Sequence, residues 1–235
     1  MNPSTTSESE RILREYDRRE REIPDDFYAL HHPANLFIRH GHETAILWGL
    51  ARAGLVPLDG RRVLEIGCGT GQWFDLFLQF GAAPADIAGV DLSAARIAAA
   101  KTRCPAADLQ VGDAAQLPWP DATFDVVFQS TVMTSILSTD VRRRVAAEML
   151  RVVKPRGALL WLDFFYNNPR NPNVRGVGKR ELNELFAGYR IERRRVTLAP
   201  PIARRLVPWS RRLAQLLEMT TLLNTHYLAV IRRTS

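Results

Sequence analysis

The chain alternates between short apolar runs and longer stretches in which apolar residues have helical spacing. Each run is three to five residues long and is bounded by glycine, acidic or turn-forming residues. Runs of this kind are typical of parallel strands buried on both faces, and the stretches between them are typical of covering helices. The runs that predict strands are residues 63–66, 87–90, 109–111, 124–128 and 158–162.

Two further strand patterns follow, residues 189–198, where apolar residues alternate with arginine, and residues 225–232. Residues 199–224 separate them as a basic amphipathic stretch with three prolines. This insertion has three interpretations: a lid over an acceptor pocket, a contact with an anionic membrane surface, or ordinary packing. Residues 1–53 predict an N-terminal helical segment that covers the site, with a helix at 8–22 and another at 43–53. Residues 54–235 form the main predicted domain.

A glycine turn follows the first predicted strand directly. Gly67, Gly69 and Gly71 let the backbone turn tightly and let a ligand approach closely. The helical pattern after the turn would point free N–H groups at that ligand. The second strand ends in Asp91, twenty positions after Gly71, where a carboxylate can accept hydrogen bonds from both hydroxyls of a ribose. Turn and acid together indicate a cofactor that contains a nucleoside.

The sequence from Glu65 to Gly71 resembles the first motif of the class I S-adenosylmethionine-dependent methyltransferases, an acidic residue followed by Gly-x-Gly-x-Gly. The resemblance runs through four later segments in order, with one departure, Arg156 in place of the first glycine of a Pro-Gly-Gly. We weighed a dinucleotide dehydrogenase and a fold that binds no cofactor as alternatives. The later segments are residues 90–93, 112–114, 124–127 and 150–159.

The resemblance implies an α/β fold: a Rossmann-like seven-stranded, mostly parallel sheet with helices on both faces and a C-terminal antiparallel hairpin strand. It also implies S-adenosyl-L-methionine as cofactor. Glu65 would orient the glycine loop or meet the methionine amino group, Asp91 would bind the ribose, and Asp113 and Ala114 would read the adenine. The full set of expected cofactor-binding residues is Tyr28, Glu65, Gly67, Cys68, Gly69, Gly71, Asp91, Leu92, Asp113, Ala114 and Gln129.

Methyl transfer from a sulfonium needs an in-line arrangement and exclusion of water, and a hydroxyl or amine acceptor benefits from a base with a pKa near neutrality. The catalytic candidates are Asp163 and Tyr166, which follow the fifth strand, and His42 in the N-terminal segment. We expect Cys68 to be a small filler in the cofactor turn. The histidines lack a cysteine or carboxylate constellation that would complete a tetrahedral site, so we expect no metal.

Composition narrows the acceptor only partly. The 235 residues carry a net charge of +7, mostly from arginine, and two cysteines. No run of 18 apolar residues predicts a spanning helix, and these features favour the cytoplasm. The leading hypothesis is methylation of a hydroxyl or amine of a small-molecule, sugar or lipid-linked acceptor, which the arginines would suit if it is phosphorylated. Nucleic acid is the less favoured partner. The alternatives are an RNA methyltransferase and a non-catalytic cofactor-binding partner protein; the oligomeric state stays open.

Overall fold

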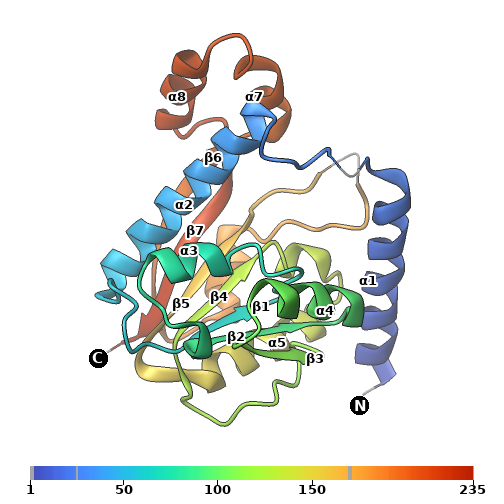
Figure 1. Ribbon diagram of the computed structural model, residues 1–235, viewed down its shortest axis with the longest axis vertical. Coiled ribbons are helices and arrows are strands. Elements are labelled where there is room, and N and C mark those ends of the chain that lie inside the picture. Colours follow the sequence, from blue (N-terminus) through green and yellow to red (C-terminus); the bar gives the residue numbers. More distant parts are fainter. Residues whose placement is uncertain (1–2, 25, 169–170, 235) are drawn as a thin grey trace.

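The computed structural model describes residues 3–24, 26–168 and 171–234, and seven strands form one sheet among them (Figure 1). The strand order is β3-β2-β1-β4-β5-β7-β6; β1 to β5 pair in parallel and β7 pairs antiparallel with both β5 and β6. The predicted fold class is therefore confirmed. The strands are β1 Val63–Ile66, β2 Ile87–Asp91, β3 Asp108–Val111, β4 Phe124–Ser130, β5 Val153–Phe164, β6 Tyr189–Leu198 and β7 Asn224–Arg233.

Two apolar cores lie on the two faces of this sheet. One core joins the sheet to α1 (Pro3–Glu22), α5 (Thr139–Val152) and α6 (Lys179–Leu185), around Trp161 and Phe124. The other joins it to α2 (Pro33–Ala53), α3 (Phe74–Gln79) and α4 (Ala94–Arg103), around Phe77 and Phe128. Because both faces are covered, the central strands read as continuous apolar runs, as the sequence pattern indicated.

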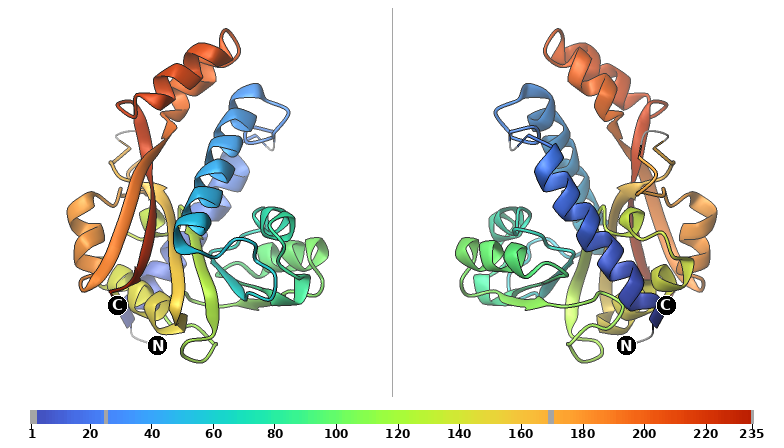
Figure 2. Two further views of the ribbon diagram at one scale, coloured as in Figure 1. Left: turned by 90° about the vertical axis from the view of Figure 1, so that its left-hand side faces the viewer. Right: turned by 90° about the vertical axis from the view of Figure 1, so that its right-hand side faces the viewer.

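A third, smaller core holds the residues between β6 and β7. Here α7 (Pro200–Leu206) and α8 (Arg211–Met219) pack on the first half of α2 and on Leu198 at the end of β6. The two helices project beyond the sheet at one end of the molecule, above the carboxyl end of β5 (Figures 1 and 2). We call residues 199–223 the α7–α8 insert. The predicted interruption of the hairpin is thus a pair of short helices.

Two local expectations need correction. The second helix begins at Pro33 rather than at residue 43, because Pro33 occupies its first turn, where a missing N–H is harmless. Strand β5 spans twelve residues instead of five, since its first part continues from α5 through Pro155.

Candidate functional site

The glycine turn after β1 lies at the centre of the sheet, between the ends of β2 and β4. Gly67, Gly69 and Gly71 all have positive φ, at 63°, 54° and 74°. A Cβ atom at Gly67 would lie 2.4 Å from Val132 Cγ2, and one at Gly71 would lie 2.6 Å from the Phe74 ring. A Cβ at Gly69 would meet nothing within 4 Å. The outer glycines are therefore required by packing, and the middle one faces open space, where a ligand can approach the backbone.

Asp91 at the end of β2 holds this turn. Its Oδ2 atom accepts a hydrogen bond from Gly69 N at 2.9 Å, and its Oδ1 atom accepts one from Ser93 N at 2.9 Å. The side chain is buried, and a carboxylate offers about four lone-pair positions. Two positions are thus used by the protein and the others stay available, so the predicted ribose contact is sterically and chemically feasible.

Asp113 and its neighbours form the end of the site where the adenine is expected. The Oδ1 atom of Asp113 accepts from Ala115 N at 2.8 Å, and its Oδ2 atom accepts from the Ser9 hydroxyl at 2.8 Å. Leu92 and Ala114 lie beside it in the lining of the same cavity. The sequence analysis missed Ser9, Ile12 and Tyr16, which line this cavity from α1. In the sequence, only the few apolar residues of this charged helix indicate that one of its sides faces the protein.

Helix α1 closes the cavity to about 40 Å³. This volume suits about one water molecule, whereas sites for cofactor-sized ligands measure roughly 300–1,000 Å³. The helix is held by polar contacts: Glu8 accepts from Leu137 N at 2.5 Å, Arg11 donates to the Ser135 carbonyl at 2.5 Å, and Glu20 pairs with Arg96. Entry of a cofactor therefore requires α1 to move outward.

The pKa values of two α1 side chains reflect this closed position. Burial acts to raise the pKa of Glu8, but hydrogen bonds from Arg11 and from the backbone of residues 137 and 138 outweigh it, and the pKa is lowered. Burial and the nearby Asp91 carboxylate raise the pKa of Tyr16. Glu8 thus accepts hydrogen bonds as a carboxylate, and Tyr16 stays a neutral phenol over the cavity.

On the other side of the glycine turn, two buried side chains each leave one polar atom without a partner among the described residues. These atoms are Glu65 Oε2 on β1 and Gln129 Nε2 on the adjacent strand β4, where Gln129 is the register partner of Ile66. The other amide atom of Gln129 accepts from Val132 N at 3.1 Å. Burial raises the pKa of Glu65, against the attraction of Arg39. Buried polar atoms normally have partners, so an unpaired acceptor and donor here suit the amino and carboxylate groups of a methionine moiety.

A ring cluster extends this side toward β7. The guanidinium of Arg39 lies 3.8 Å from the centre of the Trp73 ring, and the His42 ring lies 6.1 Å from Trp73 and 5.2 Å from His226. His226 in turn packs on Phe164 at 4.0 Å. Burial, with a smaller contribution from Arg39, lowers the pKa of His42 to about 4. Burial and His42 also lower the pKa of His226 well below its usual range.

His42 is therefore neutral at neutral pH. Its Nε2 atom is buried and has no partner among the residues that the structure describes. A neutral imidazole can accept a proton, but the low pKa makes it a weak base. Its role as a catalytic base stays a prediction.

Asp163 and Tyr166 occupy different environments. Asp163 is fully buried, and its carboxyl group accepts hydrogen bonds from Thr134 N, the Thr134 hydroxyl and Phe164 N at 2.7–3.2 Å. Burial raises its pKa to about 6 although these hydrogen bonds oppose the shift. These contacts tether the loop after β4, and the catalytic role of Asp163 stays a prediction. Tyr166 is 41% exposed, close to the rings of Phe164 and Phe165, and its catalytic role stays a prediction. Residues 169–170 of the loop that follows lie outside the described residues.

Two predicted cofactor residues lie apart from direct binding positions. Tyr28 is 54% exposed, receives a hydrogen bond from Arg19 and lies near Arg204 of α7, and it is not part of the cavity lining. Cys68 is buried, and its Sγ atom takes the space that a side chain at Gly89 would need. Burial raises the pKa of its thiol, which suits a filler. Both residues stay predictions as cofactor contacts.

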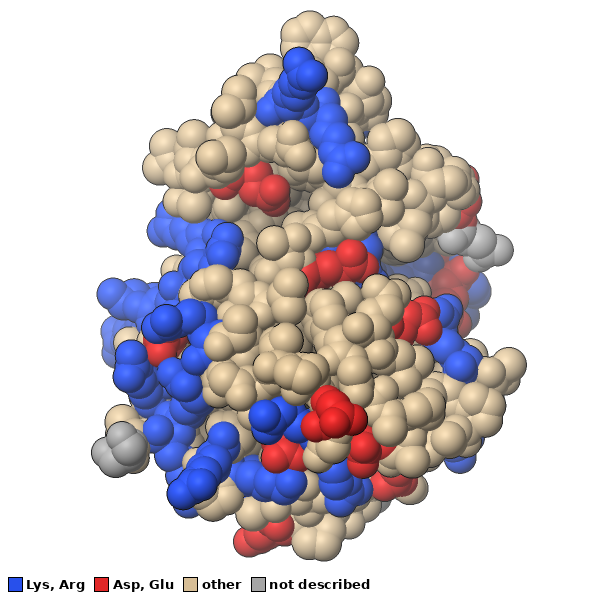
Figure 3. Space-filling view, turned by 60° about the vertical axis from the view of Figure 1, so that its left-hand side comes forward, with Lys and Arg blue, Asp and Glu red and all other residues tan. Residues whose placement is uncertain are grey.

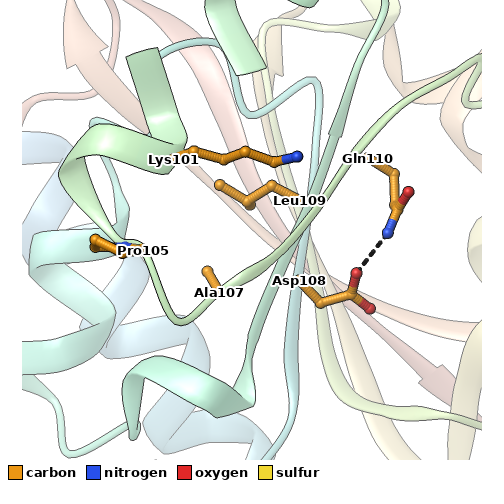
Figure 4. A pocket seen from close by; sticks show the side chains of 6 residues that line it. All are labelled: Lys101, Pro105, Ala107, Asp108, Leu109 and Gln110. Atoms are coloured by element: carbon orange, nitrogen blue, oxygen red, sulfur yellow. Dashed lines mark hydrogen bonds between the residues drawn. The ribbon is translucent and has the colours of Figure 1, made fainter. Parts of the chain in front are cut away.

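A depression along β3 and a group of three possible metal ligands are two further candidate ligand sites. A shallow depression of about 440 Å³ lies along β3 (Figure 4), but Asp108 there already accepts from Gln110 and Trp119. Among the described residues, one group of three has metal-ligand geometry: Asp26, His31 and His32, with donor atoms within 4.8 Å of each other. The sequence analysis did not connect Asp26 to this pair. The three groups are exposed or half-buried and do not complete a tetrahedral set.

Comparison with known proteins agrees with this site. Residues 63–157 match a family model described as a methyltransferase domain. The chain is 35% identical over 111 residues to a demethylmenaquinone methyltransferase of Renibacterium salmoninarum, covering 47% of this chain and 44% of that protein. It is 36% identical over 138 residues to phthiotriol/phenolphthiotriol dimycocerosates methyltransferase 1 of Mycobacterium ulcerans, covering 54% and 49%. The chain thus spans about half the length of the curated relatives it matches.

The fold resembles that of solved methyltransferases. A 1,6-didemethyltoxoflavin-N1-methyltransferase of Burkholderia thailandensis, solved with its substrate and S-adenosylhomocysteine, superposes with a TM-score of 0.63 at 17% identity. The superposition covers all of this chain and 92% of that one. All but the last two residues of the motifs quoted from the sequence lie in the matched segment. Residues 63–157 therefore match a methyltransferase domain, and the chain has the fold of these solved methyltransferases.

Proposed function

We propose that the protein transfers a methyl group from S-adenosyl-L-methionine to a small-molecule or lipid acceptor. The observation that carries this proposal is the row of polar groups at the strand ends. Asp91 fixes the open Gly69 turn, Asp113 marks the adenine end, and Glu65 and Gln129 leave a buried acceptor and donor unpaired on the other side. Taken in the strand order β3, β2, β1 and β4, these groups suit a base, a ribose and an amino acid.

The cofactor would supply an electrophilic methyl group on a sulfonium. The remaining contribution of this chain is positional: α1 closes the nucleoside side, and Trp73, Phe164 and the two neutral histidines keep water away from the other side. A hydroxyl or amine acceptor would attack the methyl carbon in line and lose its proton. The candidates to take that proton are His42, Asp163 and Tyr166.

The choice of acceptor class rests on the relatives and on the ring cluster. By their names, the curated relatives act on demethylmenaquinone and on phthiotriol dimycocerosates. The aromatic surroundings of His42 and His226 suit an apolar acceptor better than a phosphate backbone. We therefore place lipid or other small apolar acceptors ahead of RNA. A location in the cytoplasm stays part of this proposal.

Calorimetric titration with S-adenosylmethionine, S-adenosylhomocysteine and NAD tests the cofactor. We expect micromolar binding of the first two and none of NAD. Labelled methyl transfer into a cell extract, fractionated into lipids, glycans and RNA, then tests the acceptor, with label expected among the lipids or small molecules. Label confined to RNA would favour an RNA methyltransferase. Cofactor binding without transfer to any fraction would favour a non-catalytic partner protein.

A further inference from the structure

The outer surface of the α7–α8 insert carries large apolar side chains that the third core leaves uncovered. Trp209 is 80% exposed, Met219 and Leu222 are each 78% exposed, and Leu216 is 61% exposed. In contrast, Ala214 on α8 is fully buried against α2. Exposed apolar residues are ordinary when scattered, but a group of this size within one short insert indicates an interaction surface.

The helical spacing of these residues places them on one side. Leu213, Leu216 and Met219 follow one another at three-residue intervals along α8, so they share a face turned away from Ala214. Trp209 precedes the helix and Leu222 follows it. The Ser210 hydroxyl caps α8 by accepting from Leu213 N, which fixes the face relative to the protein. The insert thus presents an ordered apolar face instead of a loose hydrophobic loop.

Basic side chains accompany this face. Arg205, Arg211 and Arg212 are exposed, and none of them has an acidic partner among the described residues. The one acid of the insert, Glu218, is turned inward and accepts from Leu198 N at 3.1 Å. In Figure 3 the tip of the molecule shows basic side chains set in an otherwise uncharged surface. An apolar face with unpaired arginines matches the interface of an anionic bilayer, where the arginines can reach the headgroups.

The neighbouring loop continues the same surface. Phe27, Tyr28 and Leu30, between α1 and α2, are 39%, 54% and 50% exposed. Arg204 of α7 lies 4.4 Å from the Phe27 ring and 5.9 Å from the Tyr28 ring, which joins the loop to the insert. Figure 1 shows this loop leaving α1 and running toward α7. Tyr28, whose exposure does not fit a cofactor contact, is therefore part of an apolar surface that the loop and the insert share.

The insert also lies directly above the ring cluster of the site. Phe37 of α2 is part of the core that holds the insert, and His42 follows on the same helix. Five residues of helix span about 7.5 Å. An acceptor that leaves a bilayer at the insert therefore has a short path to the expected methyl group. Among the described residues, no helix is long and apolar enough to span a membrane.

We propose that the α7–α8 insert docks the protein on an anionic lipid bilayer, from which a membrane-resident acceptor enters the site. The role of the acceptor rests on the proposed function, whereas docking itself does not. A second copy of the chain is the poorer occupant of this surface, because two copies would bring unpaired arginines against each other.

The test is sedimentation with vesicles of phosphatidylcholine alone or with one third phosphatidylglycerol. The intact protein should bind the anionic vesicles and not the neutral ones, and added salt should weaken the binding. A variant with Trp209→Ser, Leu216→Ser, Met219→Ser and Leu222→Ser should lose binding at least tenfold. A variant with Arg205→Glu, Arg211→Glu and Arg212→Glu should lose about 100-fold, because each arginine near the surface contributes about fivefold.

The matched control replaces two exposed apolar residues elsewhere, Leu47→Ser and Val111→Ser, and should bind vesicles like the intact protein. All variants should keep calorimetric affinity for S-adenosylmethionine, which shows that they are folded and separates failure of docking from failure of the proposed function. Absence of vesicle binding by the intact protein, or equal binding by all variants, would overturn the proposal. So would a dimer in sedimentation velocity that the four serine substitutions convert to a monomer.

Discussion

Helix α1 and the α7–α8 insert both cover the edge of the sheet, and different kinds of contact hold them in place. Helix α1 is charged along most of its length and is held by hydrogen bonds and ion pairs from Glu8, Ser9, Arg11 and Glu20. The α7–α8 insert is held by a small apolar core and turns as many apolar side chains outward as inward. The outer side of α1 is polar and solvated, whereas the outer side of the α7–α8 insert is largely apolar.

The difference separates two tasks. A covering attached by a few polar contacts can open and reclose, because each contact is replaced by water when it breaks. A covering attached by apolar packing stays in place and offers its remaining surface to another phase. We therefore associate α1 with exchange of the cofactor and the insert with recruitment of the acceptor.

Asp91→Asn should produce the largest effect and should fall only on the cofactor side. The amide cannot accept from both Gly69 N and Ser93 N and also pair with ribose hydroxyls. We expect affinity for S-adenosylmethionine to fall by about 1–3 kcal/mol in calorimetry, with vesicle binding unchanged. Asp75→Asn, at an exposed acid of α3, is the control. Unchanged affinity would remove Asp91 from the ribose site.

Lowering the pH should destabilise the protein through the buried imidazoles of the acceptor side. His42 has a pKa of about 4 in the folded protein and about 6.5 when unfolded, so between these values the unfolded chain binds more protons. Stability therefore falls as the pH falls, by about 2 kcal/mol at pH 5. Asp163, with its pKa raised to about 6, opposes this trend over part of the range.

Chemical unfolding of the intact protein and of His42→Gln at pH 7 and pH 5 isolates the histidine. The intact protein should lose about 2 kcal/mol more than the variant. His40→Gln, at an exposed position of the same helix, should behave like the intact protein. Equal losses in all three proteins would show that His42 titrates normally and that the acceptor side is wetter than its ring packing indicates.

The smallest effect should come from loosening α1. Glu8→Gln combined with Ser9→Ala replaces the charged acceptor of Leu137 N and Ser138 N by a neutral one and removes the contact to Asp113, and each change is worth about 1 kcal/mol. We expect amide hydrogen exchange in α1 to rise about fivefold or more, and release of S-adenosylhomocysteine to speed up. Glu10→Gln, at an outward position of α1, is the control. If exchange in α1 does not change, packing of Ile12 and Tyr16 closes the site instead.

The sheet could be predicted from the sequence, and residues for the cofactor side could be proposed from it, because those signals are local. Residues 63–71 form a strand and a turn within one short segment, and Asp91 and Asp113 follow their strands immediately. Buried parallel strands also leave a clear apolar pattern. The resemblance to family motifs then suggests a role for each of these residues, because each motif lies at the end of one strand.

The coverings were harder to predict because their contacts are distant in sequence. Ser9 reaches Asp113 across 104 residues, and Glu8 reaches Leu137 across 129. A charged helix gives no sign of which polar residue will point inward. Likewise, the sequence proposes Asp163 as a base at the end of its strand, and it gives no sign of the hydrogen bonds that Asp163 accepts from Thr134. The expected second helix began at residue 43, ten residues after the start of α2 at Pro33.

The separation of the two coverings has a consequence for repeated turnover. Spent cofactor would leave past α1, at the far edge of the site from the insert. A fresh cofactor could then enter while the insert keeps its hold on the bilayer. The protein would work as a resident of the membrane surface that visits many acceptors in one encounter. Its output would then scale with residence time and lateral diffusion in two dimensions more than with collisions from solution.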